Sequence, residues 1–157
     1  MRSAVIVAVL SLSVVGVHAE GGEPNYRLPA PAQAAAPRAD LDSVARRYLN
    51  KTAADLRLPR SLWCADFTNL VRKEAGFRPV PSRHARDQVK GGQRISTPVI
   101  GAIVVLSRGR SWRSGHTGIV SGLTPGGDPV VISGNHNRRV AEAVYPRSRV
   151  IAYVVPN

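Results

Sequence analysis

The one cysteine of this chain, Cys64, is the residue whose type could carry covalent chemistry. A lone cysteine cannot form an intramolecular disulfide, and it lacks the companion thiolates of a cysteine-rich metal site. Three interpretations remain: an inert buried thiol, the donor of an intermolecular disulfide, or a nucleophile. Its position alone leaves all three open, so the elements around it must discriminate between them.

The segment around Cys64 predicts a helix whose first turn contains the thiol. Ser61 is the candidate N-cap, apolar residues recur at helical spacing, and Gly76 follows the predicted end at Ala75. Unpaired backbone N–H groups and the positive end of the helix dipole lie at a helix start, so this placement favours thiolate over thiol. A catalytic cysteine would benefit, because the thiolate is the attacking species.

His116 is the candidate base for such a nucleophile. It begins a predicted strand over residues 116–122 and lies between Gly115 and Gly118, where backbone or substrate can approach closely. An imidazole that faces a thiol at a helix start can take the thiol proton and later protonate a leaving amine. The pair predicts acyl transfer by a cysteine hydrolase.

A third group must hold the imidazole of His116 by its far nitrogen. Residues 129–133 are predicted to return antiparallel to residues 116–122, which brings the following segment close to the histidine. The candidates for the third group are Asn135, His136 and Asp128.

The elements that must position these residues occur as helices first and strands afterwards. Asp40 is expected to begin a helix that ends at residues 50–52, and Ser82 to cap a short helix over residues 84–90. The predicted strands are residues 98–106, 116–122, 129–133, 140–145 and 149–155. The order predicts an α+β fold, with N-terminal helices packed on an antiparallel sheet of about five strands.

The N-terminal residues 1–19 have the pattern of a secretory signal, with Arg2, a short apolar run and a cleavage site after Ala19. The apolar run is short for a membrane span and is interrupted by serines, so we expect no stable membrane insertion after cleavage. Residues 20–39 form a Pro/Ala-rich tether, and residues 40–157 are the predicted catalytic domain. Export to the periplasm or beyond places Cys64 in an oxidising environment, which favours a buried or catalytic thiol.

The charge of the chain points to an anionic partner. Lys and Arg number 22 against 10 Asp and Glu, a net charge of +12. Nucleic acid, an anionic membrane and an anionic polymer such as a cell wall are all compatible with this balance. The charges are scattered with few aromatic residues between them, so no specific nucleic-acid module is indicated. A solvated basic surface without a dedicated partner is the alternative.

Other residues carry weaker signals. A zinc site would need His84, His116 and His136, which lack a ligand-spacing motif, and we expect no metal and no cofactor. The candidates for a substrate cleft are Trp63, Trp112 and Gly115. Core packing is the alternative for Trp63, and a solvated loop is the alternative for Trp112.

Four stretches carry a family resemblance in their order and spacing: residues 63–67, 101–106, 114–120 and 133–136. They resemble the CHAP family of cysteine, histidine-dependent amidohydrolases/peptidases, which is close to the NlpC-type cell-wall peptidases. The resemblance implies a papain-like fold with Cys64 as nucleophile, His116 as base and Asn135 as the polar residue after the histidine strand. Two positions depart from the family pattern: Ser133 stands about where many members are acidic, and Ala102 stands where an aspartate is frequent.

The resemblance also implies a substrate, namely amide bonds in peptidoglycan. The enzyme would be a stem-peptide endopeptidase or an N-acetylmuramoyl-L-alanine amidase, and we expect it to act as a monomer. A competing hypothesis is a non-catalytic wall-binding or adaptor protein that retains the fold. A third is a basic exported protein that binds nucleic acid or lipopolysaccharide electrostatically.

Overall fold

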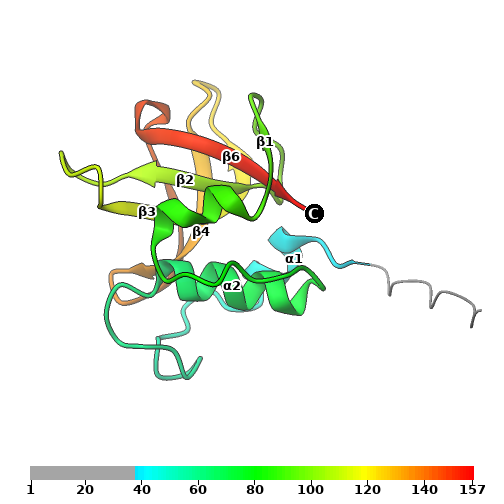
Figure 1. The fold of residues 1–157 in the computed structure, drawn as a ribbon, viewed down its shortest axis with the longest axis vertical. Coiled ribbons are helices and arrows are strands. Elements are labelled where there is room, and N and C mark those ends of the chain that lie inside the picture. The colour runs from blue at the N-terminus through cyan, green and yellow to red at the C-terminus, as the bar shows by residue number, and fades with distance from the viewer. Residues whose placement is uncertain (1–37) are drawn as a thin grey trace, which may run out of the picture. The chain divides into compact units, whose positions relative to one another are not determined.

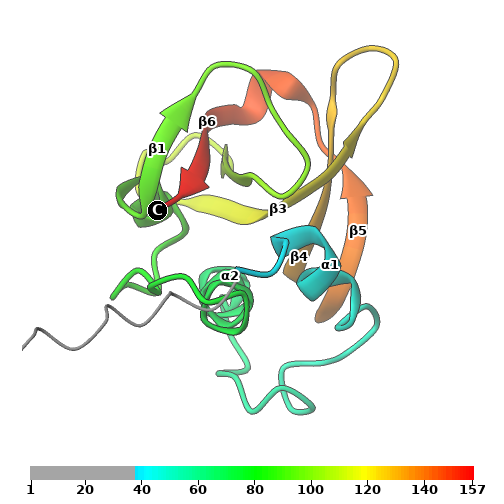
Figure 2. The ribbon, with the colours of Figure 1, turned by 90° about the vertical axis from the view of Figure 1, so that its right-hand side faces the viewer.

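The computed structural model describes residues 38–157 of the 157-residue chain. The predicted signal, residues 1–19, and residues 20–37 of the predicted tether lie outside the described residues. The described part is α+β, as predicted, with helices packed against one antiparallel sheet (Figures 1 and 2). None of its helices has the length and apolar character needed to span a membrane.

Residues 38–157 contain two α-helices, two 3-10 helices and six strands. The helices are α1 (Leu41–Arg46), α2 (Cys64–Glu74), η1 (Ala85–Lys90) and η2 (Arg147–Arg149). The strands are β1 (Gly92–Ile95), β2 (Ile103–Ser107), β3 (Gly115–Leu123), β4 (Pro129–His136), β5 (Arg139–Val144) and β6 (Val150–Pro156). The strand order in the sheet is β1-β6-β2-β3-β4-β5, and every pairing is antiparallel.

The ends of the two α-helices test the capping predictions. Asp40 caps α1 as predicted, because its carboxylate accepts the Ser43 N–H at 2.9 Å. The chain leaves α2 through Gly76 at a φ of 83°, which confirms the stop signal. The Ser61 cap is wrong: the N-cap is Trp63, without a side-chain hydrogen bond. The chain turns at Leu62 with a φ of 51°, and this turn separates Ser61 from the helix.

Two features of the sheet differ from the prediction. Residues 98–106 do not form one buried strand, because Val99 and Ile100 are exposed and β2 begins only at Ile103. The chain bends at Gly101, whose φ of 85° suits glycine. The strand β1 was not predicted from the sequence. It is a short edge strand that pairs with β6, and its two central residues are polar and exposed. Polar edge strands lack the apolar alternation that identifies a strand.

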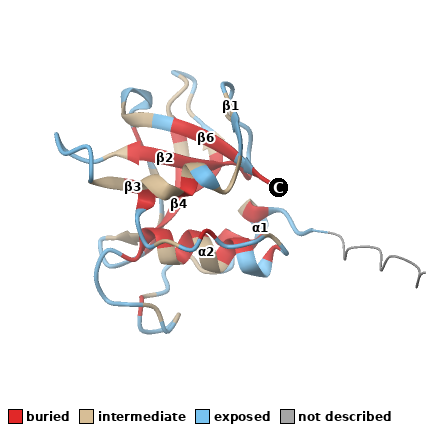
Figure 3. Cartoon of the chain, in the orientation of Figure 1, coloured by how far each residue is buried: buried red, intermediate tan, exposed pale blue. Residues whose placement is uncertain are grey.

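Buried residues gather in the central strands and in α2 (Figure 3). They form two apolar clusters, one on each face of the sheet. Ile103, Ile119 and Ile132 pack with α1 and α2 on one face. Their chain neighbours Val104 and Val120 belong to a second apolar cluster on the opposite face, as strand alternation requires. The start of α2 is therefore held against the central strands that carry the candidate base.

Candidate active site

Cys64 is the first residue of α2, and only 5% of its surface is exposed. Burial raises the pKa of the Cys64 thiol. The backbone N–H groups of Thr117, Ala65 and Cys64 itself, together with Arg108, act in the opposite direction. The expected effect of the helix start is thus present, but burial outweighs it, so the free protein holds a thiol at neutral pH.

His116 is the second residue of β3, and its ring is held by hydroxyl groups. Its Nε2 atom lies 2.9 Å from Ser133 Oγ and 3.2 Å from Tyr145 Oη. The Tyr145 hydroxyl also lies 3.0 Å from His136 Nδ1 and 3.4 Å from Ser133 Oγ. Four side chains from β3, β4 and the end of β5 therefore form one hydrogen-bonded cluster around Nε2.

The surroundings of His116 disfavour its charged form. Burial is the largest cause, and the positive charges of Arg108, Arg149 and His136 add to it. Together they lower the pKa of His116 to about 4. The imidazole is therefore neutral at pH 7 and able to accept a proton.

Cys64 and His116 come from elements that pack together. The sulfur of Cys64 lies beside the backbone N–H of Thr117, the residue that follows His116 in β3. The hydrogen bonds of His116 among residues 38–157 involve Nε2. Nδ1 makes none within this range, and it is the nitrogen that remains for a thiol.

Asn135 does not take the third position that the sequence suggested. The contacts of His116 Nε2 are with Ser133 and Tyr145, and Asn135 instead lines a neighbouring pocket with a backbone φ of 61°. His136 reaches His116 through the Tyr145 hydroxyl. The third candidate, Asp128, accepts the backbone N–H of Arg147 at 2.8 Å and does not contact the ring.

The pocket beside His116 has a volume of about 200 Å³. Its lining residues are Arg108, His116, Asn135, His136, Asn137, Tyr145 and Arg149. We call it the histidine pocket. Three of these residues belong to the predicted site or its alternatives, and the other four are Arg108, Asn137, Tyr145 and Arg149.

The predicted cleft residues lie elsewhere. Trp63 is a core residue with 1% of its surface exposed, so its assignment to a cleft is wrong. Its ring packs against Gly134, where a Cβ atom would come within 2.7 Å of the indole. Trp112 is 73% exposed beneath the Arg113 guanidinium, and Gly115 is half-buried at the start of β3. Neither lines the histidine pocket.

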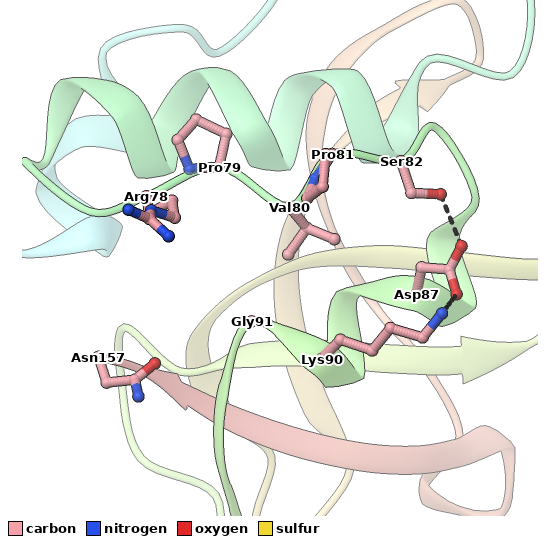
Figure 4. Close-up of a pocket in the computed structure, with 9 residues that line it drawn as sticks. All are labelled: Arg78, Pro79, Val80, Pro81, Ser82, Asp87, Lys90, Gly91 and Asn157. Atoms are coloured by element: carbon pink, nitrogen blue, oxygen red, sulfur yellow. Dashed lines mark hydrogen bonds and ion pairs between the residues drawn. The ribbon is translucent and has the colours of Figure 1, made fainter.

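A larger cavity of about 650 Å³ lies between residues 78–82, η1 and Asn157 (Figure 4). One lining residue, Asp87, accepts a hydrogen bond from Ser82 Oγ at 2.6 Å. Its carboxylate also forms an ion pair with Lys90 Nζ at 2.6 Å. Among the described residues, no cysteine or histidine lines it. Within residues 38–157 no group of three metal-ligating side chains occurs.

The sequence and fold were also compared with known proteins. The family model of the CHAP domain matches residues 57–135, half of the chain. The chain belongs to the CHAP domain family. This confirms the resemblance to the CHAP family, and the matched residues include Cys64, His116, Ser133 and Asn135.

Among solved structures, the wild-type endolysin LysIME-EF1 matches the fold with a TM-score of 0.58 at 21% sequence identity. The alignment covers 74% of this chain and 62% of the endolysin, so this CHAP protein spans less than two thirds of that neighbour's length. A search of curated proteins finds no match. The structural likeness supports the α+β fold.

Proposed function

We propose that this CHAP protein is an exported cysteine hydrolase of amide bonds in peptidoglycan. The observation that carries the proposal is the buried, neutral His116, held at Nε2 by hydroxyl groups and placed beside the start of the helix that presents Cys64. Family membership supports the thiol chemistry. The structural neighbour is named an endolysin, which supports the cell wall as the substrate.

Acylation begins with proton transfer from the Cys64 thiol to Nδ1 of His116. The sulfur attacks the amide carbon, a C–S bond forms, and the carbonyl oxygen becomes an oxyanion. The backbone N–H of Cys64 is one of the unpaired donors at the start of α2 and is available to stabilise this oxyanion. The imidazolium then protonates the leaving amine as the C–N bond breaks, which leaves a thioester on Cys64.

Deacylation reverses the proton path. Neutral His116 takes a proton from water, and the resulting hydroxide oxygen attacks the thioester carbon. The C–S bond breaks, the sulfur regains the proton from the imidazolium, and the carboxylic acid product leaves and releases its proton to solvent. No external reductant or oxidant is consumed.

Ser133 is the orienting residue in this scheme. When Nδ1 acts as the base, the Nε2–H of His116 donates to the hydroxyl oxygen of Ser133, and Tyr145 supports the same nitrogen. A hydroxyl group sets the tautomer without adding a negative charge. The catalytic imidazolium is therefore less stabilised than it would be beside a carboxylate, which agrees with the low pKa of His116.

The location of the substrate completes the proposal. Residues 1–19 direct export to the periplasm or outside, residues 20–39 serve as a tether, and residues 40–157 form the hydrolase. The bond cut is a stem-peptide amide or the amide between N-acetylmuramic acid and L-alanine.

The test is release of soluble fragments from purified peptidoglycan by residues 20–157. The comparison is with Cys64→Ala, and mass spectrometry of the fragments identifies the bond that is cut. We expect release by the unaltered protein and a loss of about three orders of magnitude in the variant.

Equal release by both proteins would exclude the thiol mechanism. No release by either protein, together with sedimentation of both with the polymer, would favour the non-catalytic wall-binding protein. Binding that disappears at modest salt and is the same for any polyanion would favour the purely electrostatic alternative.

A further inference from the structure

Two arginines stand in the wall of the histidine pocket without an acidic partner. Arg108 follows β2, and Arg149 lies at the end of η2. The ion pairs among residues 38–157 involve neither of them. Both are near enough to His116 to lower its pKa, and Arg108 also acts on Cys64.

The guanidinium of Arg149 is held in a defined position. Its Nε and Nη2 atoms donate to the carbonyl oxygen of Ser107 at 3.0 and 2.9 Å. Its Cζ atom also lies 5.3 Å from the centroid of the Tyr145 ring, an arrangement that fixes the plane of the group. Nη1 remains free of these contacts. Arg108, by contrast, has an exposed side chain on the residue after Ser107.

This placement is unfavourable for the proposed chemistry unless a negative charge enters the pocket. Acyl transfer requires His116 to become an imidazolium, and two guanidinium groups beside it oppose that charge. An anion bound between the arginines would offset them. Guanidinium groups bind carboxylates through paired, charge-assisted hydrogen bonds, which makes a carboxylate the matching ligand.

We infer that Arg108 and Arg149 bind a carboxylate of the substrate beside the scissile amide, so that the enzyme selects an anionic stem peptide. The inference rests on the proposed hydrolase function and names the substrate class of the same site. A bound carboxylate also favours the imidazolium of His116 during the reaction, so the charge of the correct substrate contributes to turnover as well as to binding.

The experiment compares two forms of one substrate. Stem peptides from purified peptidoglycan are used with their free carboxylates and after conversion of these groups to primary amides. The unaltered protein is expected to prefer the carboxylate form in kcat/KM by roughly 10- to 100-fold. Arg108→Gln and Arg149→Gln should each reduce this preference, mainly by slowing the carboxylate form, and Arg149→Lys should retain part of it.

Arg94→Gln is the matched control, because it removes one positive charge from exposed β1 at the edge of the sheet. It should leave the preference unchanged. The Arg149 variants lose the contacts to Ser107, so the exposed Arg108 provides the variant least dependent on folding. An unchanged preference in Arg108→Gln and Arg149→Gln, or an equal loss in Arg94→Gln, would overturn the inference.

Binding separates this inference from the hydrolase proposal. Calorimetry with Cys64→Ala measures the affinity for the two peptide forms when no bond is cut. The inference is supported if Cys64→Ala binds the carboxylate form more tightly and if the added Arg108→Gln change removes this difference in affinity. This holds even if the unaltered protein cleaves neither form. Equal affinity for both forms overturns it, even if Cys64-dependent cleavage is observed.

Discussion

The cavity beside Lys90 has about three times the volume of the histidine pocket, about 650 Å³ against about 200 Å³. In the larger cavity, Asp87 is satisfied by Lys90 and Ser82. In the smaller one, His116 has a shifted pKa, and two arginines have no acidic partner within residues 38–157. A titratable base with a shifted pKa in the wall of an open pocket indicates a functional site more strongly than volume does.

The arginines of the two regions differ in their exposure and in their contacts. Arg72, fully buried behind the larger cavity, donates Nη1 to the carbonyl oxygens of Gly91 and Arg78 at 2.9 and 3.4 Å. It ties the end of η1 to the segment after α2. Arg108 and Arg149 line the histidine pocket and form no ion pair within residues 38–157. Arg72 Nε and Nη2 have no partner within residues 38–157, and burial lowers the pKa of Arg72 to about 10. What separates the two regions is access, because Arg72 is enclosed by the fold whereas Arg108 and Arg149 line an open pocket that a ligand can enter.

The largest expected effect separates the two regions by activity. His116→Gln should lower peptidoglycan hydrolysis by about 10³- to 10⁴-fold, because the thiol loses its base. Lys90→Gln in the larger cavity should change the rate by less than about twofold. Rates of fragment release, normalised to folded protein by circular dichroism, provide the measurement. A comparable loss in both variants would contradict the assignment of the site.

The second effect is the pH dependence of stability. His116 has a pKa of about 4 in the folded protein and one near 6.5 when unfolded, so the unfolded state binds more protons between these values. His116 therefore contributes to the free energy of unfolding by an amount on the order of 3 kcal/mol. This contribution is fully present above pH 6.5 and is lost as the pH falls to 4. Urea unfolding of the unaltered protein at pH 7 and 4 should show this loss.

Replacement of the titrating group isolates its share of the acid effect. In His116→Gln, the loss of unfolding free energy between pH 7 and pH 4 should be smaller by the contribution of His116. In His84→Gln, a change at an exposed position, this loss should equal that of the unaltered protein. Equal acid sensitivity of the two variants would show that His116 is not buried in its neutral form.

A third prediction concerns the larger cavity and stability alone. A Cβ atom at Gly91 would come within 2.3 Å of Arg72 Nη2 and 2.6 Å of Val80 Cγ2. Gly91→Ala should therefore cost about 1–3 kcal/mol of unfolding free energy without changing activity per folded molecule. Gly126→Ala is the control, since its nearest atom would be 3.8 Å away. Loss of specific activity in Gly91→Ala would assign this cavity to the reaction.

The smallest effect distinguishes two candidates for the orienting residue. Ser133→Ala should lower kcat by roughly tenfold through loss of the hydrogen bond to His116 Nε2. Asn135→Gly removes the side chain of the other candidate, and glycine adopts the φ of 61° at this position without strain. This variant should lower kcat by less than about threefold. The reverse order of the two losses would restore Asn135 to the role that the family resemblance implied.

Local signals predicted much of this fold. The structure confirms the helix start at Asp40, the helix end before Gly76 and the strand around His116, all of which depend on chemistry confined to a few residues. The helix that begins after Asp40 ends at Arg46, earlier than the predicted end at residues 50–52. The Ser61 cap failed because the turn at Leu62 and the burial of Trp63 decide where α2 begins. Those are tertiary effects, which a capping preference does not contain.

The candidate site was predictable where residue type limits the choice. A single cysteine and a histidine at a strand start indicated Cys64 and His116. Ser133 was visible only as a departure from the family pattern, and nothing local indicated Tyr145, whose hydroxyl reaches the site through the pairing of β4 with β5. The pKa of His116 depends on burial and on distant arginines, so the sequence alone could not predict it.

Covalent labelling of Cys64 tests the central claim most directly. A stem-peptide analogue with a neutral electrophile in place of the scissile amide is incubated with the unaltered protein and with His116→Gln at pH 7, and modification is followed by intact mass and peptide mapping. We expect modification of Cys64 in the unaltered protein and a rate at least about 100-fold lower in His116→Gln. Equal rates in the two proteins, or a Cys64 that reacts only after unfolding, would contradict the account.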